Sequence, residues 1–279
     1  VLNGHLDTVG VPGRLGGRTR AYARFLRDAF VVNLKATLEY RVNFIMQFFG
    51  MMLNNAAFAA FWLVLIGRTG AVGGYGFSDV MLIWALVSTS FGLAHVVFGN
   101  VRQLGRIIME GGLDVYLLQP KDAWINVLAS RTVVSAWGDL AYGFIVLALM
   151  NGTNLERLAL FTALAVPGAL IFAATFAAAE SLTFFMGNSS AVSSALTEFM
   201  LSFSLYPEGI YGHGMRWILY SIVPSGFVAF MPLRVFRSLD WGLVPLLYLV
   251  AAAYVGLSYW LFRAGLRRYE SGNRMDARV

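Results

Sequence analysis

The sequence contains no cysteine and only three histidines among its 279 residues. The missing thiols exclude a disulfide framework, a thiolate zinc site, an iron–sulfur cluster and a cysteine nucleophile. The dipeptide Gly-Lys does not occur, so the chain lacks the GxxxxGK[ST] phosphate loop and cannot bind ATP in that manner. Any ATP-driven work would therefore need a nucleotide site on a partner chain.

Charge is scarce as well, at 13% of the residues against roughly 25% in ordinary soluble domains. Hydrophobic residues make up 58%, and the mean hydropathy is +0.65. A soluble fold could not bury so much apolar surface. The composition therefore predicts an integral all-α membrane protein rather than a soluble enzyme.

Apolar runs of about 20 residues, the length that crosses a bilayer as a helix, predict six transmembrane helices. They lie near 43–66, 79–99, 125–150, 158–183, 190–206 and 242–262. We expect one transmembrane domain over 18–279, preceded by a polar, Gly-rich stretch at 1–17 that is poorly structured.

Residues 18–42 have a helical pattern with an apolar and a charged face. The apolar face holds Tyr22, Leu26, Phe30 and Leu34, and the other holds Arg24, Asp28, Lys35 and Glu39. The pattern predicts an amphipathic interfacial helix whose basic residues meet anionic headgroups. The alternative is a soluble helix packed on a partner.

The segment 206–240 is too apolar for a solvated loop, yet prolines and glycines interrupt it repeatedly. They are Pro207, Gly209, Gly212, Gly214, Pro224, Gly226 and Pro232. Non-helical backbone is tolerated at membrane depth where protein or a water-filled cavity surrounds it. We expect a re-entrant helical element before the last span; one extra, poorly formed span is the alternative.

Basic residues set the orientation, because cytoplasmic loops are enriched in Lys and Arg. Twelve of the 21 Lys and Arg lie before residue 42 or after residue 262, which indicates membrane topology rather than nucleic-acid binding. With six spans, the side that carries both termini has fifteen basic residues and the other side five. Both termini are therefore expected in the cytoplasm, with Arg131 left inside the third span.

The stretch Leu2–Val9, LNGHLDTV, resembles the metal-binding HxDTV stretch of zinc aminoacylases and dipeptidases. That chemistry needs further His and acidic ligands on a soluble α/β scaffold. The other histidines, His95 and His213, lie in a predicted span and in the predicted re-entrant element. We therefore expect no metal site, and interpret His5 and Asp7 as a chance match.

The loop from Arg102 to Pro120 is the most informative polar segment. It begins as an amphipathic helix, breaks at Gly111 and Gly112, and ends at Pro120. A helical loop with polar and aromatic residues, held close to the membrane, could dock a partner protein. It could equally be a connector that lies on the bilayer.

Two motifs carry a family resemblance. The run GLDVYLLQP at 112–120 resembles the signature loop of the type-two ABC export permeases, in the branch that includes viologen-exporter permeases. The stretches YPEGI at 206–210 and IVPSGFVAFMP at 222–232 resemble the segment before the last span in that branch. The order of parts agrees over about residues 20–270.

The resemblance implies a bacterial cytoplasmic-membrane assembly of two permease chains, like or unlike, with two P-loop ATPase subunits that bind ATP and Mg. The loop at 102–120 would contact an ATPase subunit, and the N-terminal helix would brace that contact. The implied docking residues are Gly112, Leu113, Asp114, Tyr116, Leu117 and Pro120. The glycines would form the turn. Leu113, Tyr116 and Leu117 would supply the apolar contact with the ATPase subunit. Asp114 would cap the helix or pair with a basic group on that subunit.

Polar residues inside spans are candidates for the translocation path, because a buried charge costs at least about 2.5 kcal/mol on insertion. The candidates are Asn54, Asn55, Asp139 and Glu198. We place Asp139 near the middle of the third span and Glu180 near the cytoplasmic end of the fourth. Helix packing is as good an explanation as substrate contact for each.

These features favour a permease of an ATP-driven exporter, with no catalytic residue of its own. An ion-coupled carrier using Asp139 or Glu198 is the second hypothesis, weakened by the lack of a clear inverted repeat. The third hypothesis, an intramembrane hydrolase, would have only Ser225 as a serine nucleophile and His95 as its histidine partner. The acidic residues and the resemblance both favour a cationic amphiphile as substrate, although peptides, lipids and antibiotics stay open.

Overall fold

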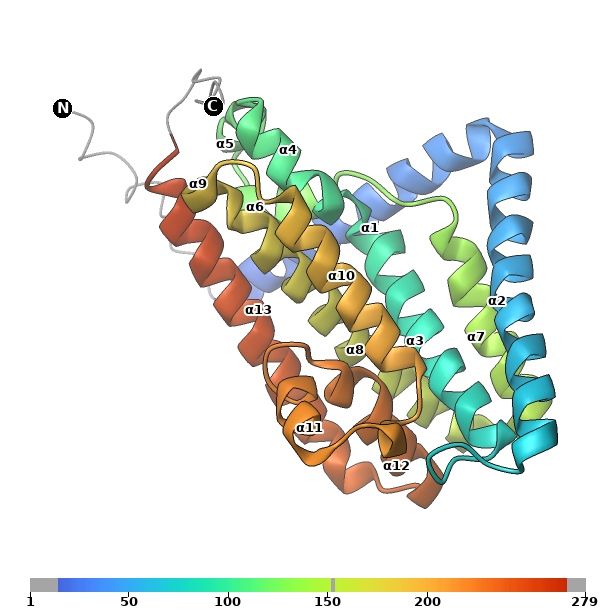
Figure 1. The fold of residues 1–279 in the computed structure, drawn as a ribbon. Helices are drawn as coiled ribbons and strands as arrows, with labels where there is room; N and C mark the ends of the chain where they lie inside the picture. Colours follow the sequence, from blue (N-terminus) through green and yellow to red (C-terminus); the bar gives the residue numbers. More distant parts are fainter. Residues whose placement is uncertain (1–14, 152–153, 270–279) are drawn as a thin grey trace.

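The computed structural model describes residues 15–151 and 154–269. Helices dominate, and no β-strand occurs in these ranges (Figure 1). Four helical stretches are long and apolar enough to cross a membrane: Arg41–Thr69, Phe77–Val97, Leu155–Met186 and Trp241–Leu266. The expected all-α membrane fold is thus confirmed. Of the stretch 1–17, only its last three residues are described, as the start of the first helix.

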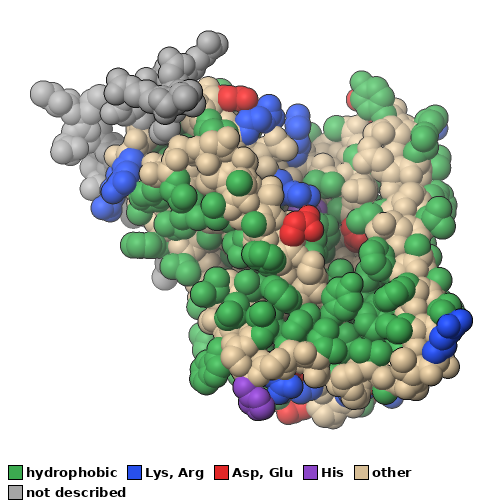
Figure 2. Space-filling model, viewed as in Figure 1, with side chains coloured by type: hydrophobic (Ala, Val, Ile, Leu, Met, Phe, Trp, Pro, Cys, Tyr) green, Lys and Arg blue, Asp and Glu red, His purple; other side chains and the backbone are tan. Residues whose placement is uncertain are grey.

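Figure 2 shows how the side chains divide along the molecule. A broad hydrophobic band occupies the middle of this face, and most of the basic side chains lie toward the two ends. Such a band is the surface that bilayer hydrocarbon would cover.

Helix α1, Leu15–Glu39, crosses the bundle obliquely and runs toward the end of the bundle that carries residues 104–117 (Figure 1). Tyr22, Leu26, Phe30 and Leu34 are all half-buried on one face, as the pattern predicts. The helix ends at a sharp corner at Tyr40, after which α2, Arg41–Thr69, runs along the bundle. Contact with a membrane surface stays a prediction for α1.

The core is built around α3, Phe77–Val97, most of whose residues are buried. It packs against α7, Ala136–Asn151, and α8, Leu155–Ser181, while α13, Val244–Leu266, packs against α8. Small residues bring α3 and α7 close together. A Cβ at Gly92 would lie only 2.6 Å from the backbone N of Leu140 and 2.8 Å from the backbone O of Ala136.

We expect Gly92→Val to destabilise the protein by about 2–3 kcal/mol, because the new side chain forces the backbones of α3 and α7 apart. Thermal unfolding of the purified chain in detergent would measure the loss. Gly256→Val is the matched control, since nothing lies within 4 Å of a Cβ there in α13. Equal melting temperatures for the two variants would contradict the close packing of α3 on α7.

The structure differs from the sequence expectation at the third span, 125–150. Two helices replace it: α6, Ala123–Ala129, and α7. Between them, residues 130–135 form no helix, and Val133 N donates a hydrogen bond to His95 O of α3 at 3.0 Å. Gly99 permits this contact, because a Cβ there would lie 2.7 Å from Val133 N. Arg131 consequently lies in this break segment and not inside a helix.

The helices α7 and α10, Ser190–Leu205, have 16 residues each, fewer than the roughly 20 that span a bilayer. Both nevertheless run in the same general direction along the bundle as α2, α3, α8 and α13 (Figure 1). The count of six crossings therefore stays a prediction.

The segment 206–240 forms short helical pieces at the end of the bundle opposite to residues 104–117 (Figure 1). They are η2, Glu208–Ile210, α11, His213–Leu219, the π-helical η3, Gly226–Phe230, and α12, Met231–Ser238. Arg237 pairs with Asp79 at the start of α3, and Arg234 lies 3.7 Å from Glu208. These ion pairs fix the segment on itself and on α3. Its position relative to a membrane stays a prediction.

Candidate functional site

The candidate docking loop lies at the end of the bundle opposite to the segment 206–240 (Figure 1). After α3, the 3₁₀ turn η1, Gly99–Gln103, leads into α4, Leu104–Met109, and α5, Asp114–Leu117, follows a tight turn. Gly111 has φ +73°, which favours glycine, and Gly112 N donates to Ile107 O at 2.8 Å. The two glycines therefore form the turn that the sequence predicts.

The side chains of this loop divide into an inner and an outer set. Leu113 is 0% exposed and packs in the core, so within this chain it anchors the loop. Val115 and Leu118, which the sequence analysis did not single out, are 65% and 88% exposed, and Leu117 is exposed as well. The outward apolar surface of the loop is therefore Val115, Leu117 and Leu118, which we call the α5 patch.

Tyr269, three residues after the end of α13, lies against the loop: a Cβ at Gly111 would be 3.9 Å from its hydroxyl. Burial, followed by the neighbouring Asp114 carboxylate, raises the pKa of the Tyr269 phenol to about 12. The Tyr269 ring also packs edge-on against Phe184 of α9, Thr183–Met186, with ring centroids 6.2 Å apart. Asp114 therefore faces a tyrosine of its own chain, a partner that the sequence analysis did not anticipate.

A second set of contacts binds the loop to α6. The Tyr116 hydroxyl lies 3.4 Å from Ser130 Oγ, and Gln119 Oε1 accepts from Asn126 Nδ2 at 2.8 Å. Shortly after Pro120, Asp122 accepts from Trp124 N at 3.0 Å and caps α6, and its other oxygen accepts from Tyr259 of α13. The loop is thus attached to α6, and Asp122 also attaches its end to α13.

Glu180 connects the loop to α10. Its Oε2 accepts a hydrogen bond from Gly105 N of α4 at 3.1 Å, and its Oε1 accepts from Ser193 Oγ of α10 at 2.5 Å. A Cβ at Gly105 would collide with the Glu180 carboxylate and lie 2.9 Å from Thr183 Oγ1, so a larger residue there would displace the carboxylate from its hydrogen bond. We call this arrangement the Glu180 bridge: one carboxylate of α8 that holds α4 and α10 together.

A polar cavity of about 570 Å³ lies beside the Glu180 bridge. Its walls come from η1, α4, the end of α8, α9 and α10, and they combine two arginines with several hydroxyl groups. The residues that contribute them are Arg102, Arg106, Thr183, Ser190, Ser193, Ser194 and Thr197. The cavity and the bridge together place a polar space directly behind the docking loop.

The sequence placed Glu180 near a span end but missed its role. A carboxylate in the last turn of a helix is disfavoured by the helix dipole, so its presence there is itself a signal. The two donors that stabilise it come from residues 75 positions earlier and 13 positions later, which no local pattern reveals.

The four candidates for the translocation path do not form one site. Asn55 and Asp139 meet between α2 and α7, where Asn55 Nδ2 donates to Asp139 Oδ1 at 2.7 Å and both side chains are buried. Asn54 and Glu198 are exposed on this chain. Asp139 lies in the first turn of α7 and not in the middle of a span, because the helix begins only at Ala136.

The hydrolase hypothesis receives no support from the geometry. Ser225 Oγ donates to Met200 O at 3.2 Å, and His95 Nδ1 donates to Phe91 O at 2.9 Å. Each side chain is thus bonded to a backbone carbonyl instead of to the other. Within residues 15–151 and 154–269, no group of three or more His, Asp or Glu is placed to hold a metal ion, and His5 and Asp7 lie outside those ranges.

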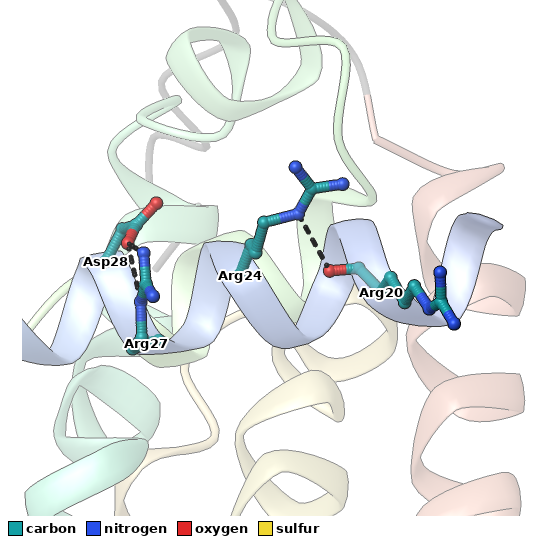
Figure 3. Close-up of polar contacts among 4 residues, drawn as sticks. All are labelled: Arg20, Arg24, Arg27 and Asp28. Carbon is teal, nitrogen blue, oxygen red and sulfur yellow. Dashed lines mark hydrogen bonds and ion pairs between the residues drawn. The ribbon is translucent and has the colours of Figure 1, made fainter. Parts of the chain in front are cut away.

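Helix α1 contributes basic side chains at this end of the bundle. Arg24 Nε donates to the backbone O of Arg20 at 3.4 Å, and Arg27 pairs with Asp28 at 2.9 Å (Figure 3). These side chains are exposed, so the pair contributes little stability. Their position beside the docking loop adds positive charge to the face on which a partner or a membrane would lie.

Comparison with known proteins gives one match. Residues 51–273 match the sequence profile of a family described as "ABC-2 family transporter protein". The matched range starts within α2 and includes the docking loop, the Glu180 bridge and the segment 206–240. No curated protein and no solved structure shows a significant match to the chain.

Proposed function

This chain belongs to the ABC-2 transporter family, whose members are membrane permeases of ABC transporters, and we propose that it is the membrane subunit of an ATP-driven exporter. Its energy would come from ATP and Mg bound to two separate P-loop ATPase subunits. A second permease chain, identical or different, would complete the assembly in a bacterial cytoplasmic membrane, with both termini in the cytoplasm.

The observation that carries this proposal is the α5 patch. Three large apolar side chains project from a short helix at the end of the bundle where basic residues concentrate. Exposed apolar groups surrounded by polar residues are typical of protein contacts. Gly112, Asp114, Tyr116 and Pro120 shape the loop, and Leu113 anchors it from inside. We infer that the ATPase subunit binds this patch.

The same contacts offer a route for movement from the ATPase to the spans. A shift of α4 would act on α10 through the Glu180 bridge, and a shift of α5 would act on α13 through Asp114 and Tyr269. Alternating access needs such a rigid connection between the energy-consuming subunit and the helices that line the path. The docking loop would thus drive α10 and α13 together.

We propose a cationic amphiphile as the substrate, because acidic side chains lie in or beside the spans. Asn55 and Asp139 would act from the buried contact between α2 and α7, and Asn54 and Glu198 from exposed positions that a second permease chain could cover. An ion-coupled carrier remains the alternative, with Asp139 as the proton-binding group.

Reconstitution tests the proposal directly. The chain would be placed in lipid vesicles together with its co-isolated ATPase, and uptake of a fluorescent cationic amphiphile would be followed. We expect transport that needs hydrolysable ATP and is insensitive to collapse of the proton gradient. Transport that follows the proton gradient and ignores ATP would overturn the exporter assignment in favour of the carrier.

A further inference from the structure

A second cavity, of about 280 Å³, lies in the corner between α1, α2 and the break segment 130–135. It is separate from the cavity at the Glu180 bridge and shares no residue with it. Side chains of all three elements line it: Asn33, Ala36, Thr37, Tyr40, Asn43, Arg131, Thr132 and Val134. The corner therefore forms an open hollow whose walls combine apolar surface with amide and hydroxyl groups and one cation, Arg131.

That cation is unpaired. Within residues 15–151 and 154–269, Arg131 forms no ion pair and no hydrogen bond. Asn43 accepts from Gln47 Nε2 through its Oδ1 at 2.9 Å, which leaves its own amide hydrogens as donors. A guanidinium with free N–H donors binds phosphate in a bidentate manner, and nearby amide donors add to that preference. The chemistry of the cavity fits a phosphate group.

An apolar surface continues from the cavity along α2. Tyr40 and Asn43 also border a shallow groove whose other walls are Glu39, Arg41, Val42 and Met46. Val42 and Met46 are among the most exposed apolar side chains of the chain, and α2 as a whole is mostly unburied. A ligand seated here would contact a phosphate-binding polar cavity and an apolar wall at the same time, which are the two parts of a phospholipid.

We propose that this corner binds one anionic phospholipid, its phosphate on Arg131 and its acyl chains along Val42 and Met46. Charge supports an anionic over a zwitterionic lipid. Arg41 borders the groove and Lys35 precedes Ala36 of the cavity wall, so with Arg131 three basic residues outnumber the one acid, Glu39. The more distant arginines of α1 point along its other half (Figure 3). A free phosphate ion would contact the cavity at Arg131 and leave the apolar groove along Val42 and Met46 empty. The lipid would join α1, α2 and the break segment. Next to this corner, α1 is already held to the end of α6, where Asn33 Nδ2 donates to Ala129 O at 3.0 Å.

The test counts lipids on the full-length chain. The protein, purified in mild detergent, would be titrated with phosphatidylglycerol or phosphatidylcholine and examined by native mass spectrometry. We expect wild type to retain phosphatidylglycerol in preference, and Arg131→Gln to bind it about tenfold more weakly. Arg131→Lys, which keeps the charge, should recover part of the binding. Arg68→Gln, an exposed arginine at the other end of α2, is the matched control and should bind as wild type does.

A second variant leaves the charge in place. Ala36→Phe would fill the cavity without touching Arg131, and we expect it to lose phosphatidylglycerol as Arg131→Gln does. Phosphatidylglycerol binding at wild-type strength by both variants would overturn the proposal. Equal retention of phosphatidylcholine, or displacement of the lipid by millimolar inorganic phosphate, would overturn the assignment of the site to an anionic lipid.

Discussion

Replacing Leu118 by aspartate is expected to abolish binding of the ATPase subunit while leaving the chain folded. Leu118 is the most exposed side chain of the α5 patch. In a protein contact it would be buried, and a carboxylate in its place would be desolvated without a partner. Loss of a central apolar contact costs about 2 kcal/mol or more, which corresponds to a fall in affinity of roughly thirtyfold or greater.

Co-purification of the ATPase with tagged Leu118→Asp would measure that loss, and ATP hydrolysis in the eluate would report it independently. Leu118→Met is the matched control, because it keeps an apolar group of similar size at the same position. An unchanged melting temperature would show that the chain itself is intact. Retention of the ATPase at wild-type levels by Leu118→Asp would show that the α5 patch does not bind it.

Glu180→Ala is expected to separate ATPase binding from transport. The variant removes both acceptors of the Glu180 bridge and so disconnects α4 from α10, but it leaves the α5 patch unchanged. Gly105 N and Ser193 Oγ would then lose a charged acceptor, a type of hydrogen bond that contributes about 1.5–3 kcal/mol. We expect the ATPase to bind with normal affinity and ATP-driven transport to fall at least about tenfold.

Parallel assays on the same reconstituted vesicles, one for transport and one for ATP hydrolysis, would measure the two effects. Glu110→Ala is the control, since Glu110 is exposed and makes only a 3.7 Å surface ion pair with Arg106. Ser193→Ala removes one donor from the bridge and should give an intermediate loss. If Glu180→Ala transports as well as wild type, the bridge is merely structural and does not couple α4 to α10.

The long apolar helices could be read from the sequence because their signal is local. A run such as 79–99 is predominantly apolar, and α3 follows it within two residues at each end. The turn in the docking loop was equally readable, since Gly111 and Gly112 supply the backbone freedom that it needs. For such elements, residue type alone determines the outcome.

Other features depend on contacts between distant residues. The break at 130–135 exists because His95 O accepts from Val133 N and because Gly99 leaves room for it. The burial of Leu113 follows from packing in the core, so a residue that the motif marks as a contact instead anchors the loop. Asn55 and Asp139 form a pair because α2 packs on α7. None of these contacts leaves a periodic pattern in the sequence.

The break segment also determines how a force on the docking loop can travel. An unbroken helix over 123–151 would be rigid and would transmit a displacement of the loop along its axis. Here the amide of Val133 bonds to α3 and not to α6, so α6 and α7 can change their relative tilt without breaking a helical hydrogen bond. The hydrogen bond to His95 O would act as the pivot of this change. When the loop and α6 move on one side of it, α7 would tilt on the other side.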